Sequence, residues 1–334
     1  MRSLLAATFL LVLALLGGVV ATGATADGPA PQANSSAPAV PLAARSACFG
    51  AAARDPRGPC RDARLTDFVY PRPALAATIP NSPCEPVERQ EHMNVCSFGA
   101  APEDATETIA LVGDSHASHW RAALDVVAQE RGWRGLSMAH TSCPLSKAVR
   151  DLEGAERFNA CAAWKRAVFA WFEQHPEIHT VFVAGLSGGA SVLPSGGRGR
   201  FATSVSGYRN AWNALPATVK RIVVIRDTPK MSKETGACVN RALSRRDRAG
   251  KACSMPRRTV LDRDPLVVAA SRMPASRVRS VDLTNLFCDR DCYPVVGGAL
   301  VFRDQNHMTA AFSTTLGPYL LRKVNALMAD WVTR

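Results

Sequence analysis

Patterns common in metal-binding and nucleic-acid-binding proteins are missing from this sequence. It contains no C-x-x-C pair, and no histidine lies within a few residues of Cys288 or Cys292, so neither a zinc site nor any other metal site is expected. No basic run interleaved with aromatic residues stands out, and no internal repeat is visible. These absences argue against a nucleic-acid-binding protein and against a repeat architecture.

Long apolar runs are also scarce, because only one is present and it stands at the start of the chain. Arg2 precedes an apolar run from 4 to 20, and residues 24–26 (ATA) have the small-x-small pattern of a signal-peptidase site. Residues 1–26 are therefore predicted to be a signal peptide, with an uncleaved membrane anchor as the alternative. Either reading predicts an exported, extracytoplasmic protein.

Cysteine, by contrast, is abundant, with ten residues that fall as sequence neighbours. That number is typical of disulfides formed in an oxidising compartment. Because short loops are easily closed, pairing in sequence order is predicted, although the sequence alone allows other connectivities. The predicted pairs are Cys48 with Cys60, Cys84 with Cys96, Cys143 with Cys161, Cys238 with Cys253, and Cys288 with Cys292.

Positive charge exceeds negative charge, and the formal net charge is +12. In an exported protein this excess favours an anionic envelope surface, such as lipid headgroups or acidic wall glycans, as the neighbour. A generally basic, solvated surface is the alternative. No nucleic-acid partner is expected.

Composition divides the chain into four segments. Residues 27–45 are rich in Ala, Pro, Ser and Gly, which is linker composition. Residues 46–107 carry four cysteines and show little periodicity, so an irregular, disulfide-tied lead-in is predicted. Residues 108–334 are predicted to form the main domain.

Strand-like apolar runs and helical segments alternate along the main domain. The predicted strands are 108–112, 136–140, 180–185, 221–226 and 278–283, and the predicted helices between them include 156–174, 203–214 and 261–273. This alternation predicts a mostly parallel sheet with helices on both faces. In such folds the active site gathers at the carboxyl ends of the strands.

The stretch IALVGDSHASHW, residues 109–120, changes period at its centre. A buried-strand pattern stops at Gly-Asp-Ser, and Trp120, Leu124 and Val127 then recur at helical spacing. Ser115 is thus predicted to stand on a tight turn from strand to helix, where nucleophilic serines often lie. The alternative is that Ser115 merely caps the helix, since serine is a favoured N-cap residue.

A serine nucleophile needs a base with an orienting acid, and VFRDQNHMTAAF (301–312) supplies both. Asp304 and His307 stand three residues apart just before a helix, so one loop can hold them at one edge of the sheet.

Other titratable residues near these motifs are expected to be structural. His116 and His119 follow the serine, but helix geometry is expected to direct neighbouring side chains away from one another. His140 ends a predicted strand and is expected to be structural. Asp227 in IRDTP is the rival for the acid, although a turn role is expected, and Asp114 is expected to bond neighbouring amides.

The GDS turn after the first strand and the D-x-x-H before the last helix occur in the order typical of the SGNH, or GDSL-type, hydrolase superfamily. Over roughly residues 84–334 the chain resembles this superfamily, and most closely the extracytoplasmic SGNH domains joined to bacterial family-three membrane O-acyltransferases. The supporting motifs are LVGDSHASHWRAAL (111–124), TSCPLS (141–146), CAAW (161–164), VVIRDTPK (223–230), LFCDRDCYPVVGG (286–298) and VFRDQNHMT (301–309).

The resemblance implies a three-layer α/β/α, flavodoxin-like SGNH fold with a five-stranded, mostly parallel sheet. It also implies that Ser115 is the acyl nucleophile, His307 the general base and Asp304 the residue that orients the imidazole. No cofactor is implied.

For the oxyanion hole, the superfamily uses the serine amide, a glycine after the second strand and an asparagine after the third. This chain departs from that pattern, because AHTSCP lacks the glycine and AGLSGGAS places Ser187 at the asparagine position. The expected donors are therefore the Ser115 amide and Ser187, with the backbone amides of Gly185, Gly188 and Gly189 as the alternative to Ser187.

The function implied is serine-dependent transfer of an O-acyl group, expected to be acetyl, on envelope carbohydrate. The expected partners are an acylated donor, a glycan acceptor and a separate membrane acyltransferase. A stand-alone carbohydrate esterase is the first alternative. A carbohydrate-binding module with a degenerate site is the second, motivated by Ser187.

Overall fold

The computed structural model describes residues 40–80, 82–187 and 192–333, which belong to a compact unit that begins at Val40. The predicted signal peptide and most of the predicted linker lie outside the described residues. The described end of the linker forms a 3-10 helix at Leu42–Arg45, which the linker prediction missed. Among the described residues, no helix combines the length and apolar character needed to cross a membrane.

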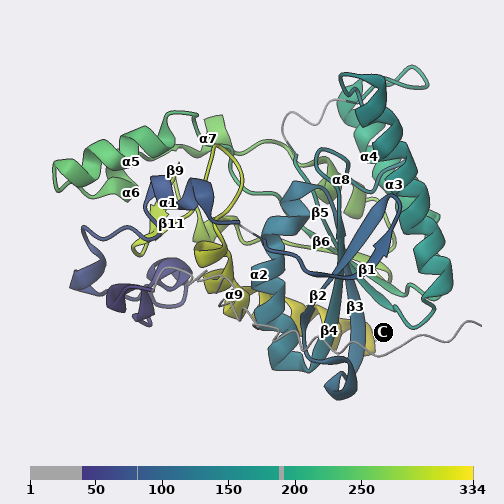
Figure 1. Cartoon of the computed structure of the whole chain (residues 1–334), viewed down its shortest axis with the longest axis horizontal. Coiled ribbons are helices and arrows are strands. Elements are labelled where there is room, and N and C mark those ends of the chain that lie inside the picture. The colour runs from purple at the N-terminus through teal and green to yellow at the C-terminus, as the bar shows by residue number, and fades with distance from the viewer. Residues whose placement is uncertain (1–39, 81, 188–191, 334) are drawn as a thin grey trace, which may run out of the picture. The chain divides into compact units, whose positions relative to one another are not determined.

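A seven-stranded sheet with the order β1-β2-β4-β3-β5-β6-β8 forms the centre (Figure 1). Its strands are β1 (Pro86–Gln90), β2 (Met93–Gly99), β3 (Glu107–Gly113), β4 (Trp133–Ala139), β5 (Thr180–Ala184), β6 (Arg221–Ile225) and β8 (Val278–Val281). The five strands β4, β3, β5, β6 and β8 are parallel to one another. Strand β2 pairs antiparallel with both β1 and β4. The parallel part has the 2-1-3-4-5 order of flavodoxin-like folds, which confirms the predicted fold class.

Helices cover both faces of the sheet (Figure 1) and bury a separate core on each. One face carries α2 (Ser115–Arg131) and α9 (Ala310–Val332), and the other carries α3 (Ala155–Gln174), α4 (Arg200–Asn213) and α8 (Pro265–Ala270). Trp120 and Phe312 are buried in the first core, and Trp164 and Trp212 in the second. The sheet therefore has the three-layer arrangement expected from strands buried on both sides.

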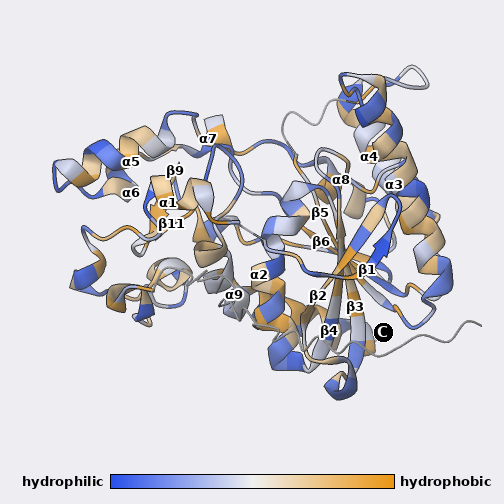
Figure 2. Cartoon of the chain, in the orientation of Figure 1, coloured by the Kyte–Doolittle hydropathy of each residue, from blue (hydrophilic) through white to orange (hydrophobic). Residues whose placement is uncertain are grey.

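The predicted strand count was two too low, because the lead-in segment supplies β1 and β2. Figure 2 shows that β1 is largely hydrophilic, unlike the central strands. This strand lies at the edge of the sheet and most of its residues are exposed, so it lacks the apolar run by which buried strands are recognised.

The rest of the lead-in packs with later parts of the chain. Val69 and Ala76 share a third core with Val239, Ala242 and Leu300. The elements that pack around it are α1 (Pro73–Thr78), α5 (Thr235–Ser244), α6 (Ala249–Ala252), β10 (Val295–Val296) and β11 (Ala299–Leu300). The remaining elements are α7 (Arg257–Val260), β7 (Met255–Pro256), β9 (Asp291–Cys292) and the 3-10 helices at Gly50–Arg54, Ala63–Leu65, Pro102–Asp104 and Thr284–Leu286. The lead-in is thus part of the same compact unit.

All five predicted disulfides are present. Each closes a short loop, and the Cys143–Cys161 bond ties the segment after β4 to α3. Disulfides of this kind constrain the unfolded chain and fit an exported protein.

The glycine of the GDS turn is required by a close approach of two strands. A Cβ at Gly113 would overlap the carbonyl oxygen of Ala184 and lie 2.8 Å from the Cβ of Ala117. Gly113→Ala is therefore expected to lower the free energy of unfolding by about 3 kcal/mol, measured by urea denaturation. Gly58→Ala is the matched control, because nothing lies within 4 Å of its added Cβ. Equal stability of the two variants would contradict the packing argument.

Candidate active site

Ser115 is the first residue of α2, directly after the turn that ends β3. The N-cap residue is Asp114, whose carboxylate accepts the backbone N–H of His116 at 2.8 Å. Asp114 also accepts the N–H of Leu186, as expected for a residue that binds neighbouring amides. The capping alternative for Ser115 is therefore excluded, and its hydroxyl is free for another partner.

That partner is His307, 192 residues further along the chain. His307 Nε2 lies 2.9 Å from Ser115 Oγ, and His307 Nδ1 lies 2.8 Å from Asp304 Oδ2. Because an ionised carboxylate only accepts hydrogen bonds, Nδ1 carries the proton and Nε2 is left to accept from the serine hydroxyl. The structure thus brings Ser115, His307 and Asp304 into one hydrogen-bonded chain, as the sequence predicts.

The loop that carries Asp304 and His307 is locked by its own backbone. Asp304 Oδ1 accepts the N–H groups of Asn306 and His307, and Arg303 N–H donates to the carbonyl of His307. Burial raises the pKa of Asp304, but the hydrogen bonds from the His307 side chain and these two amides outweigh it and lower the pKa to about 2. The carboxylate therefore stays ionised at any ordinary pH.

A buried histidine holds this loop against α2. His119 Nδ1 accepts the N–H of Met308 at 3.3 Å, and Ser313 Oγ donates to the carbonyl of His119. Burial first, and then the nearby His116 and His307, hold the pKa of His119 well below its ordinary value. His119 is therefore a neutral structural residue that positions the segment next to His307.

The three side chains open into a polar cavity of about 350 Å³. Its other lining residues are Ser82 from the lead-in, Ser118 on α2, Thr141 after β4 and Arg303. This lining of hydroxyl and charged groups suits a hydroxylated, polar ligand better than an apolar one. Ser82 could not be predicted as a site residue, because it lies in a segment without periodicity.

His116, the residue after Ser115, forms a buried ion pair with Asp227 that was not predicted from the sequence. His116 Nδ1 lies 2.5 Å from Asp227 Oδ1, and Asp227 Oδ2 also accepts the N–H and the hydroxyl of Ser187. Burial lowers the pKa of His116, but the charge and hydrogen bond of Asp227 raise it above its ordinary value. Burial raises the pKa of Asp227, but His116 and the Ser187 donors lower it overall. Asp227 was expected to form a turn, but its carboxylate binds His116 and Ser187 instead. Among the described residues, no hydrogen bond or ion pair joins Asp227 to His307, which Asp304 binds.

The same contacts correct the prediction for the oxyanion hole. Both donors of Ser187 point to Asp227, so Ser187 is not available to an oxyanion in this structure. Gly185 is buried against Asp114, since a Cβ there would lie 3.4 Å from its carboxylate. Gly188 and Gly189 lie outside the described residues. The Ser115 amide lies in the first turn of α2, where backbone N–H groups have no partner within the helix.

His116, His119 and Asp227 form a group whose potential ligand atoms lie within 4.8 Å of one another. A metal ion held between His116 Nδ1 and the Asp227 carboxylate would need these atoms about 3 Å apart, given metal–ligand bonds near 2.1 Å. They lie 2.5 Å apart, which a direct hydrogen bond explains. Hydrogen bonding thus accounts for the Asp227 end of this group without an ion.

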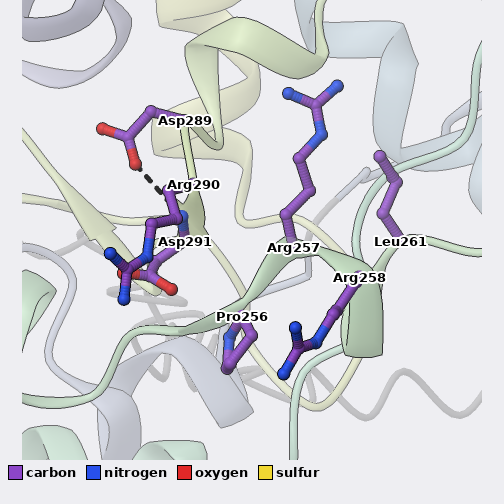
Figure 3. Close-up of a pocket in the computed structure, with 7 residues that line it drawn as sticks. All are labelled: Pro256, Arg257, Arg258, Leu261, Asp289, Arg290 and Asp291. Atoms are coloured by element: carbon purple, nitrogen blue, oxygen red, sulfur yellow. Dashed lines mark hydrogen bonds between the residues drawn. The ribbon is translucent and has the colours of Figure 1, made fainter.

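A larger cavity of about 500 Å³ lies elsewhere, between α7 and the Cys288–Cys292 loop. Figure 3 shows Arg257, Arg258 and Arg290 extending in different directions around it, with Asp289 and Asp291 beside Arg290. Its lining contains no serine, cysteine or histidine, so no nucleophile and base converge there. Size alone therefore does not identify the reactive site of this chain.

The sheet order and the Ser115–His307–Asp304 arrangement define a domain of the SGNH hydrolase type. Residues 83–322 match the family described as an SGNH domain fused to AT3 domains, and the chain belongs to this family. The resemblance predicted from the motifs is thereby confirmed.

One solved structure supports the same fold. The periplasmic domain of a lipopolysaccharide acetyltransferase from Salmonella ser. Paratyphi A matches with a TM-score of 0.50 and 14% identity, over 66% of this chain and 84% of that chain. The carboxylesterase CesB from Bacillus subtilis matches more weakly, with a TM-score of 0.29 and 15% identity, over 77% of this chain and 95% of that chain. A search of curated protein sequences finds no match.

Removing the negative charge of the buried pair is expected to be costly. Asp227→Asn leaves His116 buried beside a neutral amide, so the free energy of unfolding is expected to fall by about 3 kcal/mol or more. Asp151→Asn, which breaks the exposed pair with Arg200, is the matched control and is expected to cost less than about 1 kcal/mol.

The pH dependence of this loss follows from the two pKa shifts. The raised pKa of His116 stabilises the fold fully below pH 6.5 and less as the pH rises through the raised value. The lowered pKa of Asp227 stabilises it above pH 3.8 and less as the pH falls through the lowered value. Urea denaturation of wild type and Asp227→Asn should therefore differ most between these limits. A difference that does not change with pH would contradict an ionised pair.

Proposed function

We propose that this chain is an exported enzyme that transfers an O-acyl group, expected to be acetyl, onto envelope carbohydrate through an acyl-serine at Ser115. The observation that carries the proposal is the 2.9 Å contact between Ser115 Oγ and His307 Nε2, with Asp304 bound to the other ring nitrogen. A serine hydroxyl is a weak nucleophile until a base takes its proton, and this geometry provides the base.

In the first half of the reaction, Ser115 Oγ attacks the carbonyl carbon of the acyl donor while its proton moves to His307 Nε2. The tetrahedral intermediate then expels the donor's leaving group, which takes the proton from His307, and the acyl group remains on Ser115. In the second half, a sugar hydroxyl gives its proton to His307 and attacks the acyl-serine. Collapse of the second intermediate returns the proton to Ser115 Oγ and releases the acylated sugar.

Asp304 keeps the base in the required form throughout. With a pKa of about 2, its carboxylate remains ionised and binds the Nδ1 proton of His307. It therefore fixes the imidazole orientation and stabilises the imidazolium that forms in each half-reaction.

The developing oxyanion requires preorganised donors, and losing one typically costs about 3 kcal/mol. The Ser115 amide at the start of the 17-residue helix α2 is the donor we propose, because helix N-termini favour negative charge. A second donor is not assigned, since Ser187 is bound to Asp227. This observation favours the alternative of a carbohydrate-binding module with a degenerate site more than any other feature.

The cellular setting and partners follow from charge, cysteines and family. Five disulfides fit an extracytoplasmic protein, and the net charge of +12 suits an anionic envelope surface. The family is named for SGNH domains fused to AT3 domains, so we propose that a membrane acyltransferase supplies the acyl group. A stand-alone esterase would use the same residues with water as the acceptor.

Transfer and hydrolysis are distinguished by the product. Purified protein with nitrophenyl acetate and an oligosaccharide should give acetylated sugar, detected by mass spectrometry. Ser115→Ala and His307→Gln are expected to lose at least about a thousandfold in rate. Ser97→Ala, which removes an exposed hydroxyl from β2, is the control and should keep the wild-type rate.

Release of acetate without acetylated sugar would favour the esterase. Folded wild-type protein that is no faster than Ser115→Ala would leave the binding module as the better account.

A further inference from the structure

A third cavity, of about 240 Å³, lies between the segment that follows β4 and helix α3. Four basic side chains line it: Lys147 and Arg150 from the segment, and Lys165 and Arg166 from the helix. No acidic residue lines this cavity, and within the described part of the chain none of the four takes part in an ion pair. The cavity therefore concentrates positive charge that no ion pair neutralises.

Arg150 is the most deeply placed of the four, with 7% of its surface exposed. Its Nε donates to the carbonyl of Ser142 at 2.9 Å, but its buried Nη1 has no hydrogen-bond partner among the described residues. The carboxylates that act on it electrostatically, Asp114 and Asp151, do not hydrogen-bond to it. Burying a guanidinium in this way is unfavourable unless a partner of opposite charge is present.

Neighbouring positive charges also act on Lys165, the half-buried lysine of the cavity. Its Nζ donates to the carbonyl of Ala148 at 3.0 Å. Burial, followed by the charges of Arg150 and Lys147, lowers the pKa of Lys165 to about 8. A bound anion would relieve this repulsion and keep the ammonium group protonated.

Aromatic walls complete the cavity. Phe158 is 40% exposed, and Lys147 Nζ lies 3.9 Å from the ring centre of Phe169. An exposed aromatic ring beside positive charges suits a ligand with both an apolar face and an anionic group. A sugar ring that carries an acidic substituent has both.

The cavity adjoins the candidate active site through one short segment. Thr141 lines the cavity of Ser115 and His307, and the next residue, Ser142, accepts the hydrogen bond from Arg150. The Cys143–Cys161 disulfide then fixes this segment to α3, the helix that carries Lys165. Both cavities are thus held by the same covalently tied segment.

We propose that this basic cavity binds the carboxylate or phosphate of an acidic glycan and so selects the acceptor presented to Ser115. The proposal rests on the proposed function, because it assigns a glycan as the acceptor. Arg150 and Lys165 contact the anion, Lys147 and Arg166 add positive charge, and the exposed ring of Phe158 contacts the sugar.

The test is titration calorimetry at low salt with the full chain carrying Ser115→Ala, which binds without turnover. The probes are trigalacturonic acid for the carboxylate, a glycerol phosphate trimer for the phosphate, and maltotriose as the neutral sugar of matched length. At least one anionic probe is expected to bind about tenfold or more tightly than maltotriose, and to weaken as salt rises. Which of the two binds identifies the anionic group.

Charge-removing variants locate the binding. Lys165→Gln and the more exposed Lys147→Gln are each expected to weaken the anionic probe, Lys165→Gln by about tenfold. Arg157→Gln removes the same charge from an exposed position on α3 outside the cavity and should change affinity less than about twofold. Thermal unfolding of each variant verifies that it is folded.

Three results would overturn the proposal: no binding of either anionic probe, equal binding of maltotriose, or equal effects of the cavity variants and Arg157→Gln. Because binding is measured without Ser115, this outcome is independent of the acyl-transfer assay. A failed transfer assay with intact anion binding would reject the enzyme and retain the cavity.

Discussion

The hydrogen bond between Ser115 Oγ and His307 Nε2 is the interaction on which the proposed chemistry depends. It joins residues 192 positions apart, so the fold must bring two distant segments together within 2.9 Å. The end of β3 fixes the serine, and an Asp304-centred turn fixes the histidine. His119 then connects the two sides, because it lies on α2 and accepts the N–H of Met308.

Two buried carboxylates stabilise the carboxyl end of the sheet, where Ser115 lies. Asp114 follows β3 and Asp227 follows β6, the two neighbours of β5 in the sheet. Asp114 accepts the N–H of Leu186, and Asp227 accepts the N–H of Ser187. Both N–H groups belong to the segment that follows β5. The exit of β5 is therefore fixed from both sides, and the same bonds withhold Ser187 from the oxyanion. This arrangement makes the site rigid while leaving the Ser115 amide as its assigned donor.

The sequence predicted the five parallel strands and the disulfide pairs from local signals, whereas the meeting of Ser115 with Asp304 and His307 was predicted from the resemblance to the SGNH superfamily. Buried strands show apolar runs, and Asp304 and His307 share one short loop. The edge strand β1 was missed because it is polar and exposed. The His116–Asp227 pair was missed because it joins positions 111 residues apart, and no local pattern reports such a contact.

The most direct test of the central claim is covalent labelling of the folded protein with a fluorophosphonate, followed by peptide mass spectrometry. The account predicts one adduct, on Ser115, that is absent in Ser115→Ala and strongly reduced in His307→Gln, because the imidazole must take the serine proton. An adduct on another residue, or wild-type protein that stays unlabelled while correctly folded and disulfide-bonded, would contradict it.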